Sequence, residues 1–402
     1  MSQEVDVAIV GGGMVGAALA LLLAEQARIA PGRIAILEPA PVAPPAQGAP
    51  IGLRVSAIAP LNRERLTRLA VWRRLDPQRI ATIERMAVWH QSVPPDSPDV
   101  LRFDAAESGA AELGAMVENA ALQSALLAEC GQRGIALRSE RLRALALDAT
   151  GAHLQLDHGS LRAELVVGAD GAASAVRGLL QLPAATRDYG QRAIVATVRP
   201  TRAHHGTAFQ RFLSTGPLAL LPLPGRQCSI VWSAAEGRAG ELLALSPEEF
   251  GAALTAAAAG VLGKMELVGE RAAFPLRRLA ADRYVAPRVA LVGDAAHVIH
   301  PLAGQGVNQG LEDAAVLAAQ LAQRPPRESV GALAALRRYE RERRAGNALV
   351  GGVVDGLDRL FTGAGPLGSW AAREGMAWVA RSGLARRLLV RQAAAGRSWP
   401  RR

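Results

Sequence analysis

The sequence of 402 residues contains only two cysteines, Cys130 and Cys228, and a single lysine, Lys264. Two cysteines cannot build a disulfide framework, so a reducing compartment is expected. Aromatic residues make up 4% of the chain and charged residues 20%, whereas half of it is hydrophobic. This composition excludes intrinsic disorder and collagen-like or coiled-coil fibres. The length allows roughly two to three domains of about 150 residues each.

Acidic side chains are missing from residues 381–402, a segment that holds seven arginines. The formal net charge is +10, and this tail leaves only +3 for residues 1–380. We expect no nucleic-acid partner, because the tail has few aromatic side chains on which bases could stack. Arginines beside Leu384 and Leu388 suit a peripheral contact with the anionic inner membrane, or with a protein complex. A homo-oligomer contact and a solvated helical tail are the alternatives.

Charged side chains are also missing from residues 7–24 (VAIVGGGMVGAALALLLA), a run long enough to cross a membrane. Three consecutive glycines weaken a helix here, and residues 5–10 are rich in β-branched side chains. The opening MSQEVD lacks the basic segment of a signal peptide. These features favour a buried strand, a glycine turn and a buried helix, and we expect a cytoplasmic protein.

Strand-like and helical stretches alternate in the first third of the chain, which is typical of a βαβ unit in a parallel sheet. Near Tyr189 the pattern changes to short strands separated by proline and glycine turns, as in an antiparallel sheet. We therefore expect an α/β fold: a Rossmann-like domain with an inserted, mainly antiparallel β-sheet domain and C-terminal helices. The expected boundaries are 1–80, 109–185 and 281–330 for the first domain, 81–108 and 186–280 for the inserted domain, and 331–402 for the helices.

A glycine motif, Gly11-x-Gly13-x-x-Gly16, directly follows the first predicted strand and opens a helix. The first glycine permits a tight turn, the second lets a pyrophosphate approach the backbone, and the third lets helix and strand pack closely. The helix start offers free N–H groups to the phosphates. Glu38 ends the second strand, where a carboxylate accepts hydrogen bonds from an unphosphorylated ribose. This pattern predicts FAD or NAD rather than NADP.

Two further motifs point to one family of flavoproteins. Asp170-Gly171 follows a strand in LVVGADGAASAVR, and Gly293-Asp294 follows another in VALVGDAAHVIHPLAGQGVNQGLED. With these motifs the sequence resembles the class A FAD-dependent aromatic hydroxylases, which share the para-hydroxybenzoate hydroxylase fold. Stretches such as DYGQRAIVATVRP, CSIVWS and YERERRAGNALVGGVVDGLDRLF resemble the ubiquinone-biosynthesis hydroxylases, and the resemblance covers almost the whole chain. Gly346 departs from the polar residue that is frequent there.

The resemblance implies a role for each matching residue around FAD. Asp294 would accept hydrogen bonds from the ribityl chain, and backbone N–H groups of Val307 and Asn308 would stabilise negative charge on the reduced flavin. Arg54 would lie near the pyrophosphate, and Asp170 would either border the cofactor or cap a turn. The expected cofactor-binding set is Gly11, Gly13, Gly16, Glu38, Arg54, Asn119, Gln123, Asp170, Gly293, Asp294, Pro301, Gly304, Gly306, Val307 and Asn308, of which Asn119 and Gln123 carry the weakest signals.

The resemblance also implies the reaction. NAD(P)H would reduce FAD, O2 would form a C4a-hydroperoxyflavin, and this species would hydroxylate the ring of a polyprenylated phenol on the ubiquinone pathway. The stretches VATVRP and CSIVWS favour 2-polyprenylphenol. Another ring position, or a different phenol, is the alternative. A polyprenyl tail would require an apolar tunnel in the inserted substrate domain. The catalytic acid or base stays unassigned: such a ring is already activated, and no pair of residues in the sequence stands out for proton transfer.

Three other readings are weighed against this one. His297-x-x-His300 has a spacing that a metal could use, but no further cysteine or histidine cluster accompanies it, so no metal is expected. A related FAD enzyme, such as a halogenase or a prenyl reductase, is the second alternative. The W-x-W-x-I-P signature of tryptophan halogenases is absent from the sequence, and the only lysine lies outside the expected motif. A basic, non-enzymatic nucleic-acid-binding protein is the remaining alternative, and it would be colourless where a flavoprotein is yellow.

Overall fold

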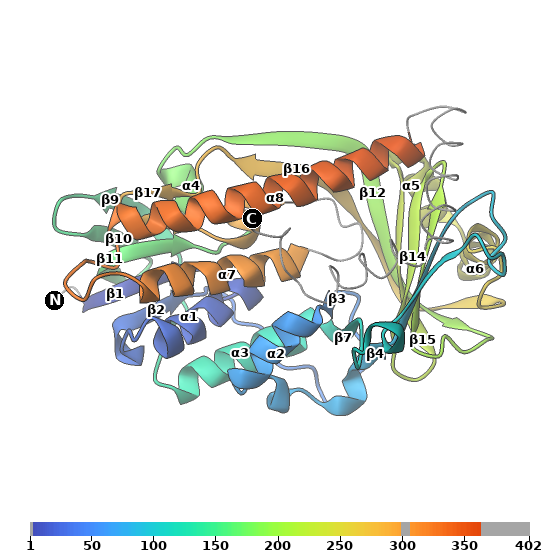
Figure 1. Ribbon diagram of the computed structural model, residues 1–402, viewed down its shortest axis with the longest axis horizontal. Coiled ribbons are helices and arrows are strands. Elements are labelled where there is room, and N and C mark those ends of the chain that lie inside the picture. Colours follow the sequence, from blue (N-terminus) through green and yellow to red (C-terminus); the bar gives the residue numbers. More distant parts are fainter. Residues whose placement is uncertain (1–2, 299–305, 363–402) are drawn as a thin grey trace.

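The computed structural model describes residues 3–298 and 306–362 (Figure 1). The chain begins with a parallel βαβ unit of strand β1 (Gln3–Val10), helix α1 (Met14–Gln26) and strand β2 (Ile34–Leu37), as the sequence predicts. Residues 16–23 of α1 are all buried, so the long apolar run is a core helix. Among the described residues, no helix is both long and apolar enough to cross a membrane.

The first sheet contains eight strands, and its centre is parallel. The order is β17-β18-β11-β1-β2-β8, and β9 and β10 extend β11 in antiparallel fashion. Strand β1 lies between β11 and β2, and its residues Val5 and Val7–Val10 are buried, as expected of a parallel strand covered on both faces. The added strands are β8 (Ala136–Arg138), β9 (Leu142–Leu147), β10 (Ala152–Leu156), β11 (Gly159–Gly168), β17 (Val285–Ala286) and β18 (Val289–Leu291).

Helices from distant parts of the chain pack beside this sheet (Figure 1). Helix α1 contacts both α3 and α7, and α7 also contacts the long helix α8. The bounds are α2 (Pro60–Arg68), α3 (Asn119–Gln132), α4 (Ala175–Leu179), α7 (Gly306–Ala322) and α8 (Leu333–Thr362). A short 3-10 helix, η5 (Gly293–Ala295), follows β18.

The second sheet is mainly antiparallel and has the order β19-β16-β12-β15-β14-β13-β5-β6. Its long strands β12 and β16 pair antiparallel and span the distance between the first sheet and the far end of the molecule: β12 runs outward and β16 returns (Figure 1). Helices α5 (Glu236–Ala244) and α6 (Pro247–Ala257) cover one face, where Ile194, Trp232 and Phe250 share a core. The strands are β5 (Arg85–His90), β6 (Leu101–Asp104), β12 (Ala184–Pro200), β13 (Thr207–Leu213), β14 (Gly216–Leu223), β15 (Gln227–Ala235), β16 (Met265–Ala281) and β19 (His297–Val298).

A third, three-stranded sheet joins the two larger ones. Its order is β3-β7-β4, with β3 at Val55–Ile58, β4 at Ala81–Ile83 and β7 at Gly114–Glu118. The expected α/β fold class, with a Rossmann-like FAD-binding part and an antiparallel sheet between its segments, is confirmed. The domain boundaries stay a prediction.

Candidate cofactor site

The three sequence motifs lie side by side at one edge of the parallel sheet. Strands β2, β1, β11 and β18 are neighbours and run in the same direction, so their carboxyl ends meet at this edge. Backbone bonds continue the ladder beyond the strands, from Gly11 N to Leu37 O (2.8 Å), from Ala169 N to Val10 O (2.8 Å) and from Val292 N to Gly168 O (2.9 Å). The crevice at the carboxyl ends of an open parallel sheet is where such folds bind nucleotides.

The glycine motif has the geometry that a pyrophosphate needs. Gly11 has φ +105°, and a Cβ there would lie 2.4 Å from the carbonyl oxygen of Ala169. A Cβ on Gly16 would lie 2.0 Å from Gly11 O, so helix α1 packs directly on the turn. A Cβ on Gly13 would meet no described atom within 4 Å, so its surface is open to a ligand. No described side chain caps α1 at Gly13, which leaves its first N–H groups available to phosphate oxygens.

Glu38 and Gln123 hold the glycine turn from two sides. Glu38 Oε2 accepts a hydrogen bond from Gly12 N (2.9 Å), and Oε1 accepts one from Ala40 N (3.1 Å). Gln123, on α3, donates from Nε2 to Gly12 O (3.0 Å). A carboxylate has about four acceptor positions, so Glu38 keeps capacity for ribose hydroxyl groups.

Arg54 and Asn119 lie at the junction between the small sheet and the antiparallel sheet. Asn119 N donates to Arg54 O (3.0 Å), and Ser56 Oγ donates to Asn119 Oδ1 (2.7 Å). The exposed guanidinium of Arg54 stacks 5.1 Å from the ring centroid of Phe274 on β16. Arg54 is therefore placed between the cofactor-side elements and the second sheet.

Asp170 caps the turn after β11. Its Oδ2 accepts hydrogen bonds from Ala175 N (2.6 Å) and Val176 N (3.2 Å) at the start of α4. Its Oδ1 is buried and has no partner among the described residues. The capping role of Asp170, which the sequence left as an alternative, is present in the structure. Its Oδ1 can still accept a hydrogen bond at the Asp170-Gly171 motif.

The Gly293-Asp294 turn is fastened to helix α7. Gly293 has φ +58°, and its N–H donates to Asp313 Oδ2 (2.9 Å). The side chain of Asp294 is exposed, but enough protein surrounds it that desolvation raises the pKa of its carboxyl group. His297 lowers and Asp313 raises the pKa of Asp294 in addition.

Asp313 is the buried centre of a polar network that sequence reasoning missed. It has no exposed surface, and it accepts hydrogen bonds from His297 Nε2 (2.6 Å) and from Arg343 Nε (2.5 Å). Burial alone would raise the pKa of Asp313, but His297 and Arg343 outweigh that effect and lower it to about 2. Asn347 lies 3.5 Å from the same carboxylate. The one sequence signal for this network was Asp313 itself, an acidic residue within the apolar helix pattern that follows Asn308.

Asn308 connects the start of α7 to the small sheet. Its Oδ1 accepts from Ala59 N (2.9 Å) and from Asn62 Nδ2 (3.0 Å), and its Nδ2 donates to Ala57 O (2.7 Å). Gly306 and Val307 form the first residues of α7, as the motif requires. Pro301, Gly304 and His300 lie outside the described residues. Asn62 is a second residue that the sequence did not reveal.

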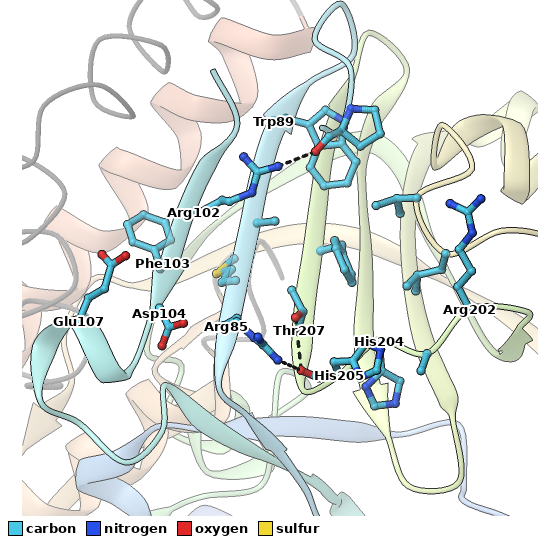
Figure 2. Close-up of a pocket in the computed structure, with 17 residues that line it drawn as sticks. Arg85, Trp89, Arg102, Phe103, Asp104, Glu107, Arg202, His204, His205 and Thr207 are labelled. Carbon is cyan, nitrogen blue, oxygen red and sulfur yellow. Dashed lines mark hydrogen bonds between the residues drawn. The ribbon is translucent and has the colours of Figure 1, made fainter. Parts of the chain in front are cut away.

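A separate cavity of about 910 Å³ lies on the antiparallel sheet (Figure 2). Ala87, Trp89 and Phe209 line it and pack with Val261, on the face that also carries α6. Arg85, Arg102 and Arg202 stand around its rim, as Figure 2 shows. None of the glycine, Asp170 or Gly293-Asp294 motifs lines it. Within the described ranges, no cluster of three or more metal-ligating side chains is present.

The comparisons with known proteins agree with this geometry. A family model described as FAD binding domain matches residues 105–350. The chain is 41% identical to ubiquinone hydroxylase UbiL of Rhodospirillum rubrum, over 96% of this chain and 89% of the relative. It is 35% identical to the 3-demethoxyubiquinol 3-hydroxylase of Escherichia coli (90% of each chain), and 32% identical to the human mitochondrial ubiquinone biosynthesis monooxygenase COQ6 (90% of this chain, 86% of the relative).

Two solved structures share the fold. Pseudomonas aeruginosa PqsL in complex with 2-aminobenzoylacetate has a TM-score of 0.74 at 24% identity, covering 94% of this chain and all of that one. The p-nitrophenol 4-monooxygenase PnpA of Pseudomonas putida also has a TM-score of 0.74, at 18% identity and 97% coverage of each chain. The fold and these relatives define an FAD-dependent monooxygenase of the class that uses NAD(P)H and O2. The chain belongs to the family of ubiquinone-biosynthesis hydroxylases. Its being an enzyme sets aside the nucleic-acid-binding alternative.

Proposed function

We propose that the enzyme hydroxylates the aromatic ring of a polyprenylated phenol in ubiquinone biosynthesis, with 2-polyprenylphenol as its substrate. The observation that carries the pathway is the 41% identity to a ubiquinone hydroxylase over 96% of the chain. The ring position rests on the resemblance of VATVRP and CSIVWS to hydroxylases of 2-polyprenylphenol. Similarity to a 3-hydroxylase of the same pathway makes another ring position the competing candidate.

The geometry supports a division of labour among the residues that would hold FAD. The turn at Gly11 and Gly13, with the start of α1, would bind the pyrophosphate, and Glu38 would bind the ribose. Asp294 would hold the ribityl chain, and the N-terminus of α7 would stabilise negative charge at the pyrimidine edge. FAD itself supplies the redox and oxygen chemistry.

The substrate ring would lie against the face of the antiparallel sheet that does not carry α6. Ala193 pairs with Phe274, and Phe274 contacts Arg54, so this face is directed towards the cofactor residues. Gln191 lies two residues before Ala193 and therefore on the same face, since side chains alternate along a strand. Its Oε1 is buried without a partner among the described residues, so it could accept a hydrogen bond from the phenol hydroxyl group.

Gln191→Leu tests this placement of the substrate. We expect a higher KM for the phenol and unchanged FAD binding, because the substitution removes an acceptor on the substrate side alone. The matched control is Gln155→Leu on β10, whose amide donates to Gly159 O in an exposed hairpin. A KM equal to that of the wild type would refute this role of Gln191.

Deletion of the gene followed by mass spectrometry of quinone intermediates tests the pathway and the ring position together. The accumulated precursor should be a polyprenylphenol that lacks one ring hydroxyl group, and its structure names the missing position. The wild-type gene should restore ubiquinone, whereas Asp294→Ala should restore less. A deletion strain with normal ubiquinone and no accumulated phenol would contradict the proposal.

A further inference from the structure

One oxygen of Asp313 binds both ends of the turn that carries Asp294. Its Oδ2 accepts the N–H of Gly293, the first residue of η5, and the Nε2–H of His297, which begins β19 directly after the turn. Asp294 lies between these two anchors. The ring of His297 is also stacked on Tyr284, with 5.8 Å between the centroids, so the second anchor is itself held in place.

The other oxygen of Asp313 binds helix α8. Arg343 donates from Nε to Asp313 Oδ1 (2.5 Å) and from Nη2 to Gln309 Oε1 (2.9 Å) in the first turns of α7. Asn347 accepts from the same Nη2 (2.9 Å). Asp313, Arg343 and Asn347 are all buried, so their hydrogen bonds are shielded from competing water. We call the bonds of Asp313 to the Asp294 turn and to Arg343 the clamp.

We infer that Asp313 is a positioning residue, which sets the distance between the Asp294 turn and the N-terminus of α7 so that both engage FAD at once. This inference rests on the placement of FAD under the proposed function, in which these two elements hold the ribityl chain and the isoalloxazine ring. Asp313 belongs to α7, five residues after Asn308, and it bonds the turn directly. Through Arg343 it makes the same alignment depend on the docking of α8.

A carboxylate is needed for this role, because its two oxygens only accept hydrogen bonds. The groups that face it are all donors: a backbone N–H, an imidazole N–H, a guanidinium N–H and an amide NH2. An asparagine at this position has one accepting oxygen and would point its own NH2 group at further donors. Asp313→Asn therefore keeps the volume of the side chain and releases one side of the clamp.

The affinity of the apoprotein for FAD, measured by quenching of flavin fluorescence, tests the inference. We expect Asp313→Asn to weaken binding by about ten-fold or more, the effect of losing hydrogen bonds to one charged group. At saturating FAD, the visible circular dichroism of the bound flavin should also differ from that of the wild type. A purely structural role of Asp313 would leave this spectrum unchanged.

The matched control is Tyr339→Phe. It removes the buried hydrogen bond from Tyr339 Oη to Leu291 O (2.7 Å), which also joins α8 to the parallel sheet but does not touch the turn. We expect it to lower the thermal midpoint of the apoprotein while leaving the FAD affinity and the flavin spectrum as in the wild type. Equal losses of affinity in Tyr339→Phe and Asp313→Asn would overturn the inference.

His297→Phe keeps the inference testable if Asp313→Asn fails to fold. Phenylalanine preserves the stacking on Tyr284 and removes only the donor at the far end of the turn. We expect weaker FAD binding than in the wild type from this single variant. Where Asp313→Asn does fold, the two losses in the double variant should not add, because both act through one oxygen. Unchanged affinity in His297→Phe, or full additivity, would count against the clamp.

Asp294→Ala separates failure of this inference from failure of the proposed FAD placement. If Asp294→Ala binds FAD as well as the wild type, the placement itself is wrong. If it binds weakly while Asp313→Asn and His297→Phe bind normally, the placement stands and only the positioning role of Asp313 is refuted.

Discussion

The buried ion pair between Asp313 and Arg343 gives a sharp prediction for stability. Arg343 is 2% exposed and Asp313 is completely buried. Arg343→Met fills a similar volume but removes the charge that faces Asp313 Oδ1. His297 remains beside Oδ2, so the carboxylate keeps one partner. The variant therefore leaves a buried anion that is only half compensated.

The expected cost lies near the lower end of the usual range. Removing one partner of a buried ion pair costs about 3–5 kcal/mol of unfolding free energy. Because His297 remains, we expect Arg343→Met to lose ~3 kcal/mol. The pKa of Asp313 in the folded wild type, about 2, lies below the ordinary value of ~3.9 for an unfolded chain. In the wild type this group therefore stabilises the fold above about pH 4, and the contribution is lost as the pH falls towards 2.

In the variant the sign of this contribution is expected to reverse. Without Arg343, desolvation, which is the largest influence on Asp313, raises its pKa in the folded state. The folded variant then binds a proton more readily than the unfolded chain. Its stability deficit against the wild type should be largest at neutral pH and should shrink as the pH falls towards 4. Both proteins share the other titratable groups around Asp313, which are His297, Asp294, Tyr284, Tyr339 and Glu312.

Urea unfolding of the apoproteins, followed by far-ultraviolet circular dichroism at pH 5 and pH 7.5, measures both effects. The double variant Asp313→Asn with Arg343→Met removes both charges, and it should be more stable than Arg343→Met alone. A cost below about 1 kcal/mol, a deficit that does not change with pH, or a double variant that equals the sum of the single ones would each refute the reasoning.

The remaining predictions concern packing, thiol reactivity and the tail. Gly16→Ala should cost about 1–3 kcal/mol of stability and weaken FAD binding, because its Cβ would lie 2.0 Å from Gly11 O. The control Gly240→Ala, in an open part of α5, should be neutral or stabilising when both variants are compared by thermal unfolding. Cys130 and Cys228 are buried, and burial raises the pKa of each thiol to about 12. Neither thiol should therefore react with a thiol reagent until denaturant is added. Reaction of the folded protein at pH 8 would contradict this prediction. Truncation after Gly383 should weaken sedimentation with anionic liposomes compared with neutral ones, and equal sedimentation of both chains would remove the membrane role of the tail.

The glycine motif and its acid were predictable because they belong to one local unit. Strand, turn, helix and strand follow each other within residues 3–38, and the residue types needed for the tight turn are visible in the letters alone. Gly11 and Gly16 touch, as the spacing predicts, and Glu38 reaches the same turn. The short strands and proline and glycine turns after Tyr189 also located the change to an antiparallel sheet.

The contacts that sequence reasoning missed join segments that lie far apart in the chain. Asn62 and Asn308 are hydrogen-bonded across 246 positions, and Arg343 reaches Asp313 from a different helix. Each pair depends on how α2, α7 and α8 dock, and no spacing rule encodes that docking. An acid in an apolar helix shows that a partner is needed, but it does not show which partner.

The alternation of side chains in β12 explains why the large cavity and the cofactor motifs lie on opposite sides of one sheet. Ile194, Ala196 and Val198 point to the core under α5 and α6, so Ala193 and its partner Phe274 point the other way. Phe274 meets Arg54, whose backbone binds Asn119 at the start of α3. The cavity lined by Trp89 and Phe209 belongs to the α6 side. Under the proposed placement of FAD, the substrate ring would approach the Ala193 face, and a polyprenyl tail attached to it would pass the sheet edge at β6 to reach that cavity.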